Sequence, residues 1–259
     1  MTEAARVEPD FAGKVAIVTG GGAGIGFAIA RAFARSGARV AIAGRTKERL
    51  THAANSIGEE SGAPVLVVPA DVGKHADCER IVAATVERFD GLDILVNNAA
   101  LFALVPLMEA DHTEAARFIN TNVMGPLQCS RAFAHWAVKH ERGGAIVNVS
   151  SIAGARPAPG CGLYSASKAA LESLTRSMAV EWAPLGMRVN AVAPGHVNTE
   201  GVLEDFRAGR LDEAAMIRSI PAGRIADVDD IADAVLFLCG DHARHIVGQV
   251  LTVDGGEGF

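Results

Sequence analysis

The sequence contains a single tyrosine, Tyr164, and Lys168 stands four residues after it. Residues four apart lie on the same face of a helix. A free tyrosine has a pKa of about 10, too high for a good base near neutrality, but a neighbouring lysine cation favours the phenolate and lowers that pKa. The pair could therefore exchange a proton with a carbonyl or alcohol oxygen. Taken alone, the same spacing is also typical of a solvated helix face.

A serine hydroxyl precedes this pair. Ser151 follows a short apolar run and comes thirteen residues before Tyr164. A hydroxyl at the end of a strand could donate a hydrogen bond to the substrate oxygen and hold it beside the phenol. Tyr164, Lys168 and Ser151 together predict an acid/base site for a carbonyl/alcohol pair.

A glycine-rich turn follows the first apolar run, with the pattern TGxxxGxG. Small residues let a backbone approach a pyrophosphate, and the next helix offers free N–H groups and its positive dipole end. The alternative is close packing alone, but the position after the first strand of a βαβ unit favours dinucleotide binding. The predicted cofactor residues of this turn are Gly20, Gly22, Ala23, Gly24, Ile25 and Gly26.

The end of the second apolar run bears on which dinucleotide is bound. An acid at this point binds the ribose 2′-hydroxyl of NAD, whereas a basic residue suits the 2′-phosphate of NADP. The segment carries no acid, and Arg45 can pair with a phosphate. NADP is therefore preferred and NAD remains possible. The alternative is that Arg45 is an ordinary surface arginine.

These residues must be positioned by an alternating series of strands and helices. Short continuous apolar runs predict strands that are buried on both faces, and the segments between them have helical periodicity. We expect one Rossmann-like, doubly wound α/β domain, with an approximately seven-stranded parallel sheet and helices on both faces. Its ligands should bind beyond the carboxyl ends of the strands. The expected strands are 15–18, 40–43, 65–68, 94–96, 145–149, 189–192 and 250–253, and the expected helices are 25–36, 47–61, 76–89, 113–139, 165–182 and 229–239.

Composition and charge exclude several other classes. A net charge of −6 argues against a broad nucleic-acid surface and against adhesion to anionic lipid. No run of about 18 apolar residues predicts a transmembrane helix. The four widely spaced cysteines suggest neither a metal site nor a disulfide framework, so reduced thiols in the cytoplasm are expected. Residues 1–12 are interpreted as a flexible leader and 13–259 as the domain.

Seven motifs in order resemble those of the short-chain dehydrogenase/reductase family, from Lys14 to about Gly256. One small departure is Ala100, where the family more often has glycine. The matching segments are 19–26, Asp71-Val72, Asn97-Asn98-Ala99-Ala100, Asn122, Ser150-Ser151, Tyr164 to Lys168, and Pro194-Gly195 followed by Thr199.

The resemblance implies an NAD(P)-dependent oxidoreductase and assigns roles. Tyr164 is the general acid in reduction and the base in oxidation, Lys168 lowers its pKa and binds the nicotinamide ribose, and Ser151 orients the substrate oxygen. Asn122 is linked in the family with a backbone kink and a proton relay. A homo-oligomer, tetramer or dimer, is also implied. The further cofactor contacts are Asp71 and Val72 at the adenine, Asn98, Ala99 and Ala100 at the ribose and pyrophosphate, and Pro194, Gly195, Val197 and Thr199 at the nicotinamide.

The segment 196–222 interrupts the alternation and is expected to be a substrate lid with an amphipathic stretch at 202–217. The candidate wall residues are mostly apolar, which favours a neutral small molecule or one with an apolar body. His196 is the polar exception, and a structural role for it is equally open. The predicted substrate residues are Ser151, Ala153, Cys161, Tyr164 and His196, with Phe102, Leu104, Ile152 and Phe206 as further wall candidates.

Two alternatives stay open. A 3-oxoacyl-(acyl-carrier-protein) reductase would need a basic docking face, for which Arg131, Arg142 and Arg176 are candidates around the expected mouth. A non-catalytic dinucleotide-binding regulator would keep the glycine turn but lose Tyr164 or Lys168. A hydrolase lacks its GxSxG elbow here, and a zinc alcohol dehydrogenase lacks its clustered ligands.

Overall fold

The computed structural model describes residues 10–258 and is built around a parallel sheet of seven strands in the order β3-β2-β1-β4-β5-β6-β9. This order reverses direction between β1 and β4, which creates the switch point where doubly wound folds bind ligands. The predicted fold is confirmed. The strands are β1 (Val15–Thr19), β2 (Arg39–Gly44), β3 (Leu66–Pro69), β4 (Ile94–Asn97), β5 (Gly144–Val149), β6 (Met187–Pro194) and β9 (Val250–Val253).

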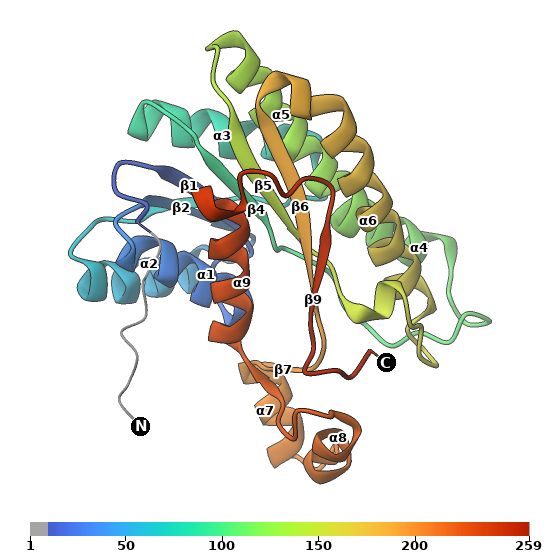
Figure 1. Cartoon of the computed structure of the whole chain (residues 1–259). Helices are drawn as coiled ribbons and strands as arrows, with labels where there is room; N and C mark the ends of the chain where they lie inside the picture. The colour runs from blue at the N-terminus through green and yellow to red at the C-terminus, as the bar shows by residue number, and fades with distance from the viewer. Residues whose placement is uncertain (1–9, 259) are drawn as a thin grey trace.

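Helices cover both faces of the sheet (Figure 1). One face carries α1 (Gly24–Arg35), α2 (Lys47–Ser61) and α9 (Val228–Cys239), and the other carries α3 (His75–Phe89), α5 (Gly125–Lys139) and α6 (Gly162–Trp182). The buried apolar side chains accordingly fall into two clusters, one on each face. Continuous apolar strands supply both clusters at once, because successive side chains point to opposite faces.

The expected helix at 113–139 is interrupted. It consists of α4 (His112–Ile119), a π-helical turn η1 (Asn120–Met124) and then α5. Pro126 has no N–H to give to the carbonyl of Asn122, so the regular bonding cannot continue through this point. The backbone instead bonds from Gly125 N to Asn120 O. A single unbroken helix was therefore the wrong expectation.

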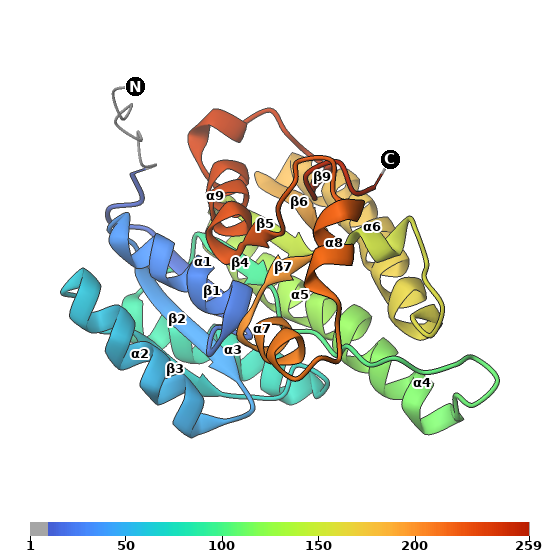
Figure 2. The ribbon, with the colours of Figure 1, turned by 90° about the horizontal axis from the view of Figure 1, so that it is seen from below.

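Residues between β6 and α9 extend beyond one end of the sheet (Figure 1), and Figure 2 views the molecule from that end. They form β7 (Val197–Asn198), α7 (Glu200–Arg207), α8 (Glu213–Ser219) and β8 (Ala226–Asp227), with β7 paired to β8. The amphipathic stretch at 202–217 is thus two helices, and Gly209 with φ of +66° lies between them. Single 3₁₀ turns occur at η2 (Ile152–Gly154), η3 (Ala183–Leu185) and η4 (Asp241–Ala243).

The expected leader at residues 1–12 is only partly covered, because residues 1–9 lie outside the described part. Phe11 belongs to the domain: its backbone N–H donates to Ser36 O at 2.8 Å, and its ring packs edge-on against Phe33 with centroids 5.0 Å apart. Buried aromatic contacts of this kind stabilise a fold by removing apolar surface from water. The folded domain therefore begins before residue 13.

Candidate active site

The predicted catalytic side chains meet at the carboxyl end of β5. Ser151 follows this strand directly, and Tyr164 and Lys168 lie in the first turns of α6, which begins at Gly162 rather than at 165. Tyr164 and Ser151 share a side-chain hydrogen bond, and the Lys168 Nζ lies 5.6 Å from the centre of the Tyr164 ring. The three residues that the spacing brought together are therefore neighbours in space.

Lys168 is almost completely buried, with 2% of its surface exposed. Its Nζ donates to the Val149 carbonyl oxygen at 2.7 Å. Burial lowers the pKa of Lys168 to about 8, and the nearby carboxylate of Glu172 opposes that shift. An ammonium carries three N–H donors, so the bond to the strand carbonyl leaves Lys168 with donor capacity for another group.

The pKa of Tyr164 shifts in the opposite direction from the one the spacing predicts. Burial raises the pKa of the Tyr164 phenol above its ordinary value, the hydrogen bond with Ser151 lowers it in part, and the Cys161 thiol raises it. Lys168 does not overcome this burial, because its ammonium faces the Val149 carbonyl. The phenol is therefore held in its neutral, proton-donating form.

A hydrogen bond between Ser150 and Glu172 lies near Lys168. Ser150 Oγ donates to Glu172 Oε1 at 2.8 Å. Glu172 lies four residues after Lys168 on α6, on the same helix face. Ser150 belongs to the Ser150-Ser151 motif of the sequence, whereas Glu172 was not predicted, since no spacing rule distinguishes it from other polar residues of a helix face.

Asn122 holds two segments together, and its side-chain hydrogen bonds go to Leu101 and Ser167. Its Oδ1 accepts from Leu101 N at 2.7 Å, and its Nδ2 donates to Leu101 O at 2.9 Å and to Ser167 Oγ at 3.0 Å. Ser167 Oγ in turn donates to Tyr164 O at 2.6 Å. Asn122 thus ties the loop after β4 to the helix turn that carries Tyr164, and the π-helical turn places it there.

The glycine turn has the shape that a pyrophosphate requires. A Cβ at Gly20 would lie 2.7 Å from Asn98 Nδ2, and one at Gly26 would lie 2.3 Å from Gly20 O, so both positions are closed by the protein itself. Gly22, Ala23, Gly24 and Ile25 are partly exposed. Helix α1 has Ala23 at its N-cap and receives no side-chain cap, so its first N–H groups are open to an anion. These features fit a dinucleotide.

Thr19 and Asn98 hold the glycine turn against the loop that follows β4. Thr19 Oγ1 accepts from Asn98 N at 3.0 Å and from Ala99 N at 3.1 Å, and Asn98 Nδ2 donates to Thr19 O at 2.9 Å. The Nδ2 of Asn98 is therefore bonded to the turn, whereas Ala100 is exposed. In the sequence, Thr19 is only the first residue of the glycine motif. In the structure, its hydroxyl holds the loop after β4 against the glycine turn.

The predicted adenine end is formed after β2 and β3. Arg45 follows β2 and is exposed, with no acid beside it. Asp71 accepts from Gly73 N at 3.0 Å and is partly exposed, while Val72 is buried against α5, where a Cβ at Gly125 would lie 3.1 Å from its side chain. Asp71 and Arg45 can face a nucleotide, and Val72 lines the floor.

The predicted nicotinamide end follows β6. Pro194 and Val197 are buried, so only their backbone and edges can face a ligand. Thr199 lies across from the glycine turn: a Cβ added at Gly24 would be 3.5 Å from Thr199 Cγ2. A Cβ at Gly195 would be 2.6 Å from Glu257 Oε2, which explains the glycine there. The nicotinamide end of the proposed cofactor bed thus lies beside the glycine turn, at Thr199 and Gly24.

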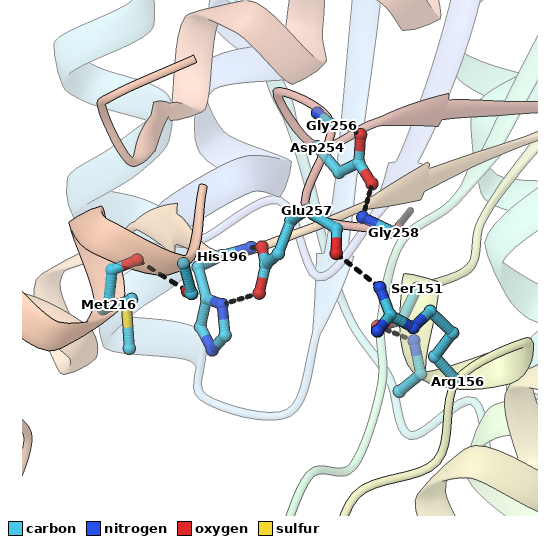
Figure 3. A network of polar contacts seen from close by, with 10 residues as sticks. Ser151, Arg156, His196, Met216, Asp254, Gly256, Glu257 and Gly258 are labelled. Atoms are coloured by element: carbon cyan, nitrogen blue, oxygen red, sulfur yellow. Dashed lines mark hydrogen bonds and ion pairs between the residues drawn. The ribbon is translucent and has the colours of Figure 1, made fainter. Parts of the chain in front are cut away.

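The predicted substrate residues surround Tyr164 unevenly. Ala153 follows Ser151, and its backbone N–H donates to Ser151 Oγ at 3.2 Å. Cys161 is buried at the start of α6, and Phe102 packs edge-on against the Tyr164 ring at 5.1 Å. His196 is exposed and pairs with Glu257 near the C-terminus (Figure 3). No sequence signal pointed to Glu257, because it is distant from His196 in the chain.

One basic residue expected around the mouth lies elsewhere. Arg142 comes just before β5, at the amino end of the strand, where its guanidinium stacks over Trp136 at 5.7 Å. It lines a cavity of about 1280 Å³ at that end, together with Lys14 and Arg188. Ligands of this fold bind at the carboxyl ends, so Arg142 does not belong to the mouth.

Residues 10–258 form one folded domain around the parallel sheet. They contain no cluster of three or more His, Cys, Asp or Glu side chains that could hold a metal ion. Within the same range, no helix has the length and apolar character needed to cross a bilayer.

Comparisons with known proteins agree with this geometry. Residues 20–257 match the family described as Enoyl-(Acyl carrier protein) reductase. The galactitol 2-dehydrogenase of Agrobacterium fabrum is 38% identical over 94% of this chain and 97% of that protein. The 3-oxoacyl-[acyl-carrier-protein] reductase of Chlamydia trachomatis is 36% identical over 94% of this chain and 96% of its own length.

A solved structure gives the same result. The L-sorbose reductase of Gluconobacter frateurii, complexed with NADPH and L-sorbose, superposes with a TM-score of 0.92 at 31% identity, covering 97% of this chain and 98% of that one. The chain belongs to the short-chain dehydrogenase/reductase family. It is an NAD(P)-dependent oxidoreductase that interconverts alcohol and carbonyl groups.

Proposed function

We propose that this enzyme is an NADP-preferring reductase or dehydrogenase of a small-molecule alcohol/carbonyl pair, with Tyr164 as its general acid and base. The observation that carries the proposal is the contact of Ser151, Tyr164 and Lys168 at the carboxyl end of β5. The nicotinamide supplies or accepts the hydride when it is bound. All proton transfer is assigned to the side chains of this chain.

The roles of Tyr164, Ser151, Lys168 and Asn122 follow from the groups that surround each side chain. Tyr164 keeps its proton because burial raises its pKa, and it gives that proton to the carbonyl oxygen during reduction. Ser151 donates a hydrogen bond to the same oxygen. Lys168 offers its remaining ammonium protons to the nicotinamide ribose, and Asn122 holds the Tyr164 turn through Ser167.

The preference for NADP rests on Arg45. It is exposed at the end of β2, where no acid is present to repel a phosphate. The solved relative that binds NADPH supports the same choice. The other cofactor residues predicted from the sequence, of which Gly20 is the first and Thr199 the last, are proposed to line the dinucleotide. Asn98 contributes by holding the glycine turn through its Nδ2.

The proposal is tested by following nicotinamide absorbance with a panel of ketones, alcohols and sugar alcohols, each with NADPH/NADP⁺ and NADH/NAD⁺. Turnover of a free ketone or alcohol with tighter binding of NADPH is the expected result. Absence of turnover with every pair would contradict the oxidoreductase assignment for small molecules.

A 3-oxoacyl-(acyl-carrier-protein) reductase is the second candidate, because a relative of that name matches almost the whole chain. Arg176 also lies toward the amino ends of the strands, since a Cβ at Gly248, just before β9, would be 4.0 Å from Arg176 Cα. Of the three basic candidates only Arg131 is left, which is a sparse docking face for an acidic carrier. An acetoacetyl thioester in the same assay distinguishes the two: preferred turnover of the thioester over free ketones would favour the second candidate.

We also propose that residues 196–222 form a lid, that the enzyme is a homo-oligomer and that it works in the cytoplasm. Helices α7 and α8 extend beyond the sheet end that carries Ser151 (Figures 1 and 2). On α6, Leu171, Met178 and Ala179 are core residues, but the apolar side chains of Phe237 on α9 and Leu251 on β9 are exposed. All four cysteines are unpaired, as in a reducing compartment.

A further inference from the structure

A carboxylate from the C-terminal segment is bonded to the one polar residue predicted in the substrate wall. Glu257 Oε1 lies 2.5 Å from His196 Nδ1, and Glu257 Oε2 accepts from the His196 backbone N–H at 3.0 Å (Figure 3). Both carboxylate oxygens of Glu257 are therefore hydrogen-bonded to His196. The Glu257 side chain is 11% exposed, whereas that of His196 is 45% exposed.

The chain end is folded so as to deliver Glu257 to this place. The Asp254 carboxylate accepts from Gly256 N at 2.9 Å and from Gly258 N at 2.6 Å, which closes a tight turn around Glu257. Gly255 and Gly256 have φ of +62° and +88°, a region that glycine adopts without strain. The Glu257 carbonyl accepts from Arg156 Nη1 at 2.6 Å. Glu257 is thus fixed by its own turn and by the segment that follows Ser151.

Strand register places this pair beside the reacting groups. Val149 of β5 is level with Val192 of β6, so Ser151 is level with Pro194, and His196 stands two residues further along. Pro194 is also level with Val253 of β9, which brings the C-terminal turn to the same edge. The pair therefore belongs to the substrate side of the site, between the Ser151 segment and the lid.

The carboxylate determines which ring nitrogen of His196 carries the hydrogen. An ionised carboxylate only accepts hydrogen bonds, so a neutral imidazole bonded to it at Nδ1 must be protonated there. The Nε2 atom then has a free lone pair and needs a donor. A plain ketone or an apolar chain has no such donor, and a substrate carboxylate would meet a second lone pair close to the Glu257 charge. A hydroxyl group satisfies Nε2.

We propose that His196 Nε2 accepts a hydrogen bond from a hydroxyl of the substrate beside its reacting carbon, and that Glu257 is the positioning residue that sets this tautomer. The substrate class is then a polyhydroxylated ketone or alcohol, of the ketose and sugar-alcohol kind. This inference rests on the proposed function of the same site and narrows its substrate. Such a substrate is neutral, in line with the expectation from the sequence.

The first experiment compares two ketones that differ in one hydroxyl, 3-hydroxy-2-butanone and 2-butanone, with L-sorbose as a longer probe. In His196→Leu we expect kcat/KM for 3-hydroxy-2-butanone and L-sorbose to fall roughly tenfold relative to that for 2-butanone, as the loss of one hydrogen bond predicts. Glu257→Gln should lower the same ratio by roughly three- to tenfold, because an amide can donate to Nδ1 and move the hydrogen to Nε2.

The matched control is a second histidine–glutamate pair, His75 and Glu79 on α3, whose Nε2 and Oε1 atoms are 3.4 Å apart on an exposed surface. His75→Leu and Glu79→Gln should leave the ratio unchanged. NADPH affinity should be unchanged in all four variants. If the enzyme turns over both ketones and the ratio is the same in wild type, His196→Leu and Glu257→Gln, the substrate inference is overturned while the proposed function stands. Absence of turnover with any ketone or alcohol would instead contradict the proposed function.

A second measurement does not depend on activity. Long-range ¹H–¹⁵N spectra of protein labelled in histidine, recorded at pH 8.5, report the tautomer of each ring, and His196→Leu assigns the resonances. We expect His196 to carry its hydrogen on Nδ1 in wild type and to change its pattern in Glu257→Gln. Hydrogen on Nε2 in wild type would overturn the inference even if both variants lost activity.

Discussion

The Nζ atom of Lys168 lies 5.6 Å from the centre of the Tyr164 ring, and its hydrogen bond goes to the Val149 carbonyl. The lysine is thus beside the phenol but bonded to a strand. This arrangement separates two tasks: burial keeps Tyr164 protonated, and the ammonium is held in place at the sheet edge where the nicotinamide ribose is proposed to bind.

Replacing Tyr164 by Phe removes only the hydroxyl that is proposed to exchange the proton. We expect kcat to fall by about 10²- to 10⁴-fold, the usual contribution of a positioned general acid, with NADPH affinity nearly unchanged. Steady-state assays and nicotinamide fluorescence titration measure the two quantities. Activity within tenfold of wild type would be incompatible with the assigned role.

Lys168 should make stability depend on pH. Its pKa is about 8 in the folded state and 10.5 in its ordinary environment. The unfolded chain therefore binds more protons between these values, and the free energy of unfolding should increase from pH 8 toward pH 10, by up to roughly 3 kcal/mol. The increase in unfolding free energy is complete above pH 10.5, and it is lost as the pH falls to about 8. Urea unfolding of wild type and Lys168→Met checks it, since the variant should lack the increase.

The single tyrosine permits a direct titration of the site. Phenolate absorbance in the folded protein reports Tyr164 alone, because no other tyrosine is present. Burial should move the midpoint above pH 10. Ser151→Ala should raise it further, because the hydrogen bond from Ser151 lowers the pKa of Tyr164. A midpoint well below 10 in the protein without nucleotide would show that Lys168 dominates after all.

Arg45 should decide the choice of nucleotide. Arg45→Asp is expected to weaken NADPH binding by about 10- to 100-fold, because a carboxylate that repels the 2′-phosphate replaces the guanidinium that pairs with it. NADH binding should be unchanged or tighter, because a carboxylate at this point can accept a hydrogen bond from the ribose 2′-hydroxyl. Arg117→Ala, an exposed arginine on α4, is the control. Equal losses for NADPH and NADH would show that Arg45 does not read the 2′-phosphate.

The glycine turn offers a matched pair of substitutions. Gly20 and Gly13 both have positive φ, +68° and +78°, but a Cβ at Gly20 meets Asn98 Nδ2 at 2.7 Å and one at Gly13 meets nothing within 4 Å. Gly13→Ala should cost only the backbone strain of about 1 kcal/mol. Gly20→Ala should cost clearly more and should also weaken NADPH binding. Similar unfolding free energies for the two variants would contradict the close approach.

The sequence by itself determined the sheet, the glycine turn and the Ser151, Tyr164 and Lys168 set. These features are local: strands such as Val15–Thr19 are continuous apolar runs, and the distance from Tyr164 to Lys168 is one helical turn. Local periodicity is enough to place residues on a face. The order of the strands within the sheet, by contrast, is known only from the structure.

Only the tertiary structure decided the rest. It turned Asn98 toward the glycine turn, placed Arg142 at the far end of the sheet, interrupted the helix at Asn122 and raised the pKa of Tyr164 through burial. Above all, it brought Glu257 to His196 across 61 positions of sequence. Such contacts depend on how strand ends meet and how deeply a side chain is buried, and neither quantity is present in the spacing of residues along the chain.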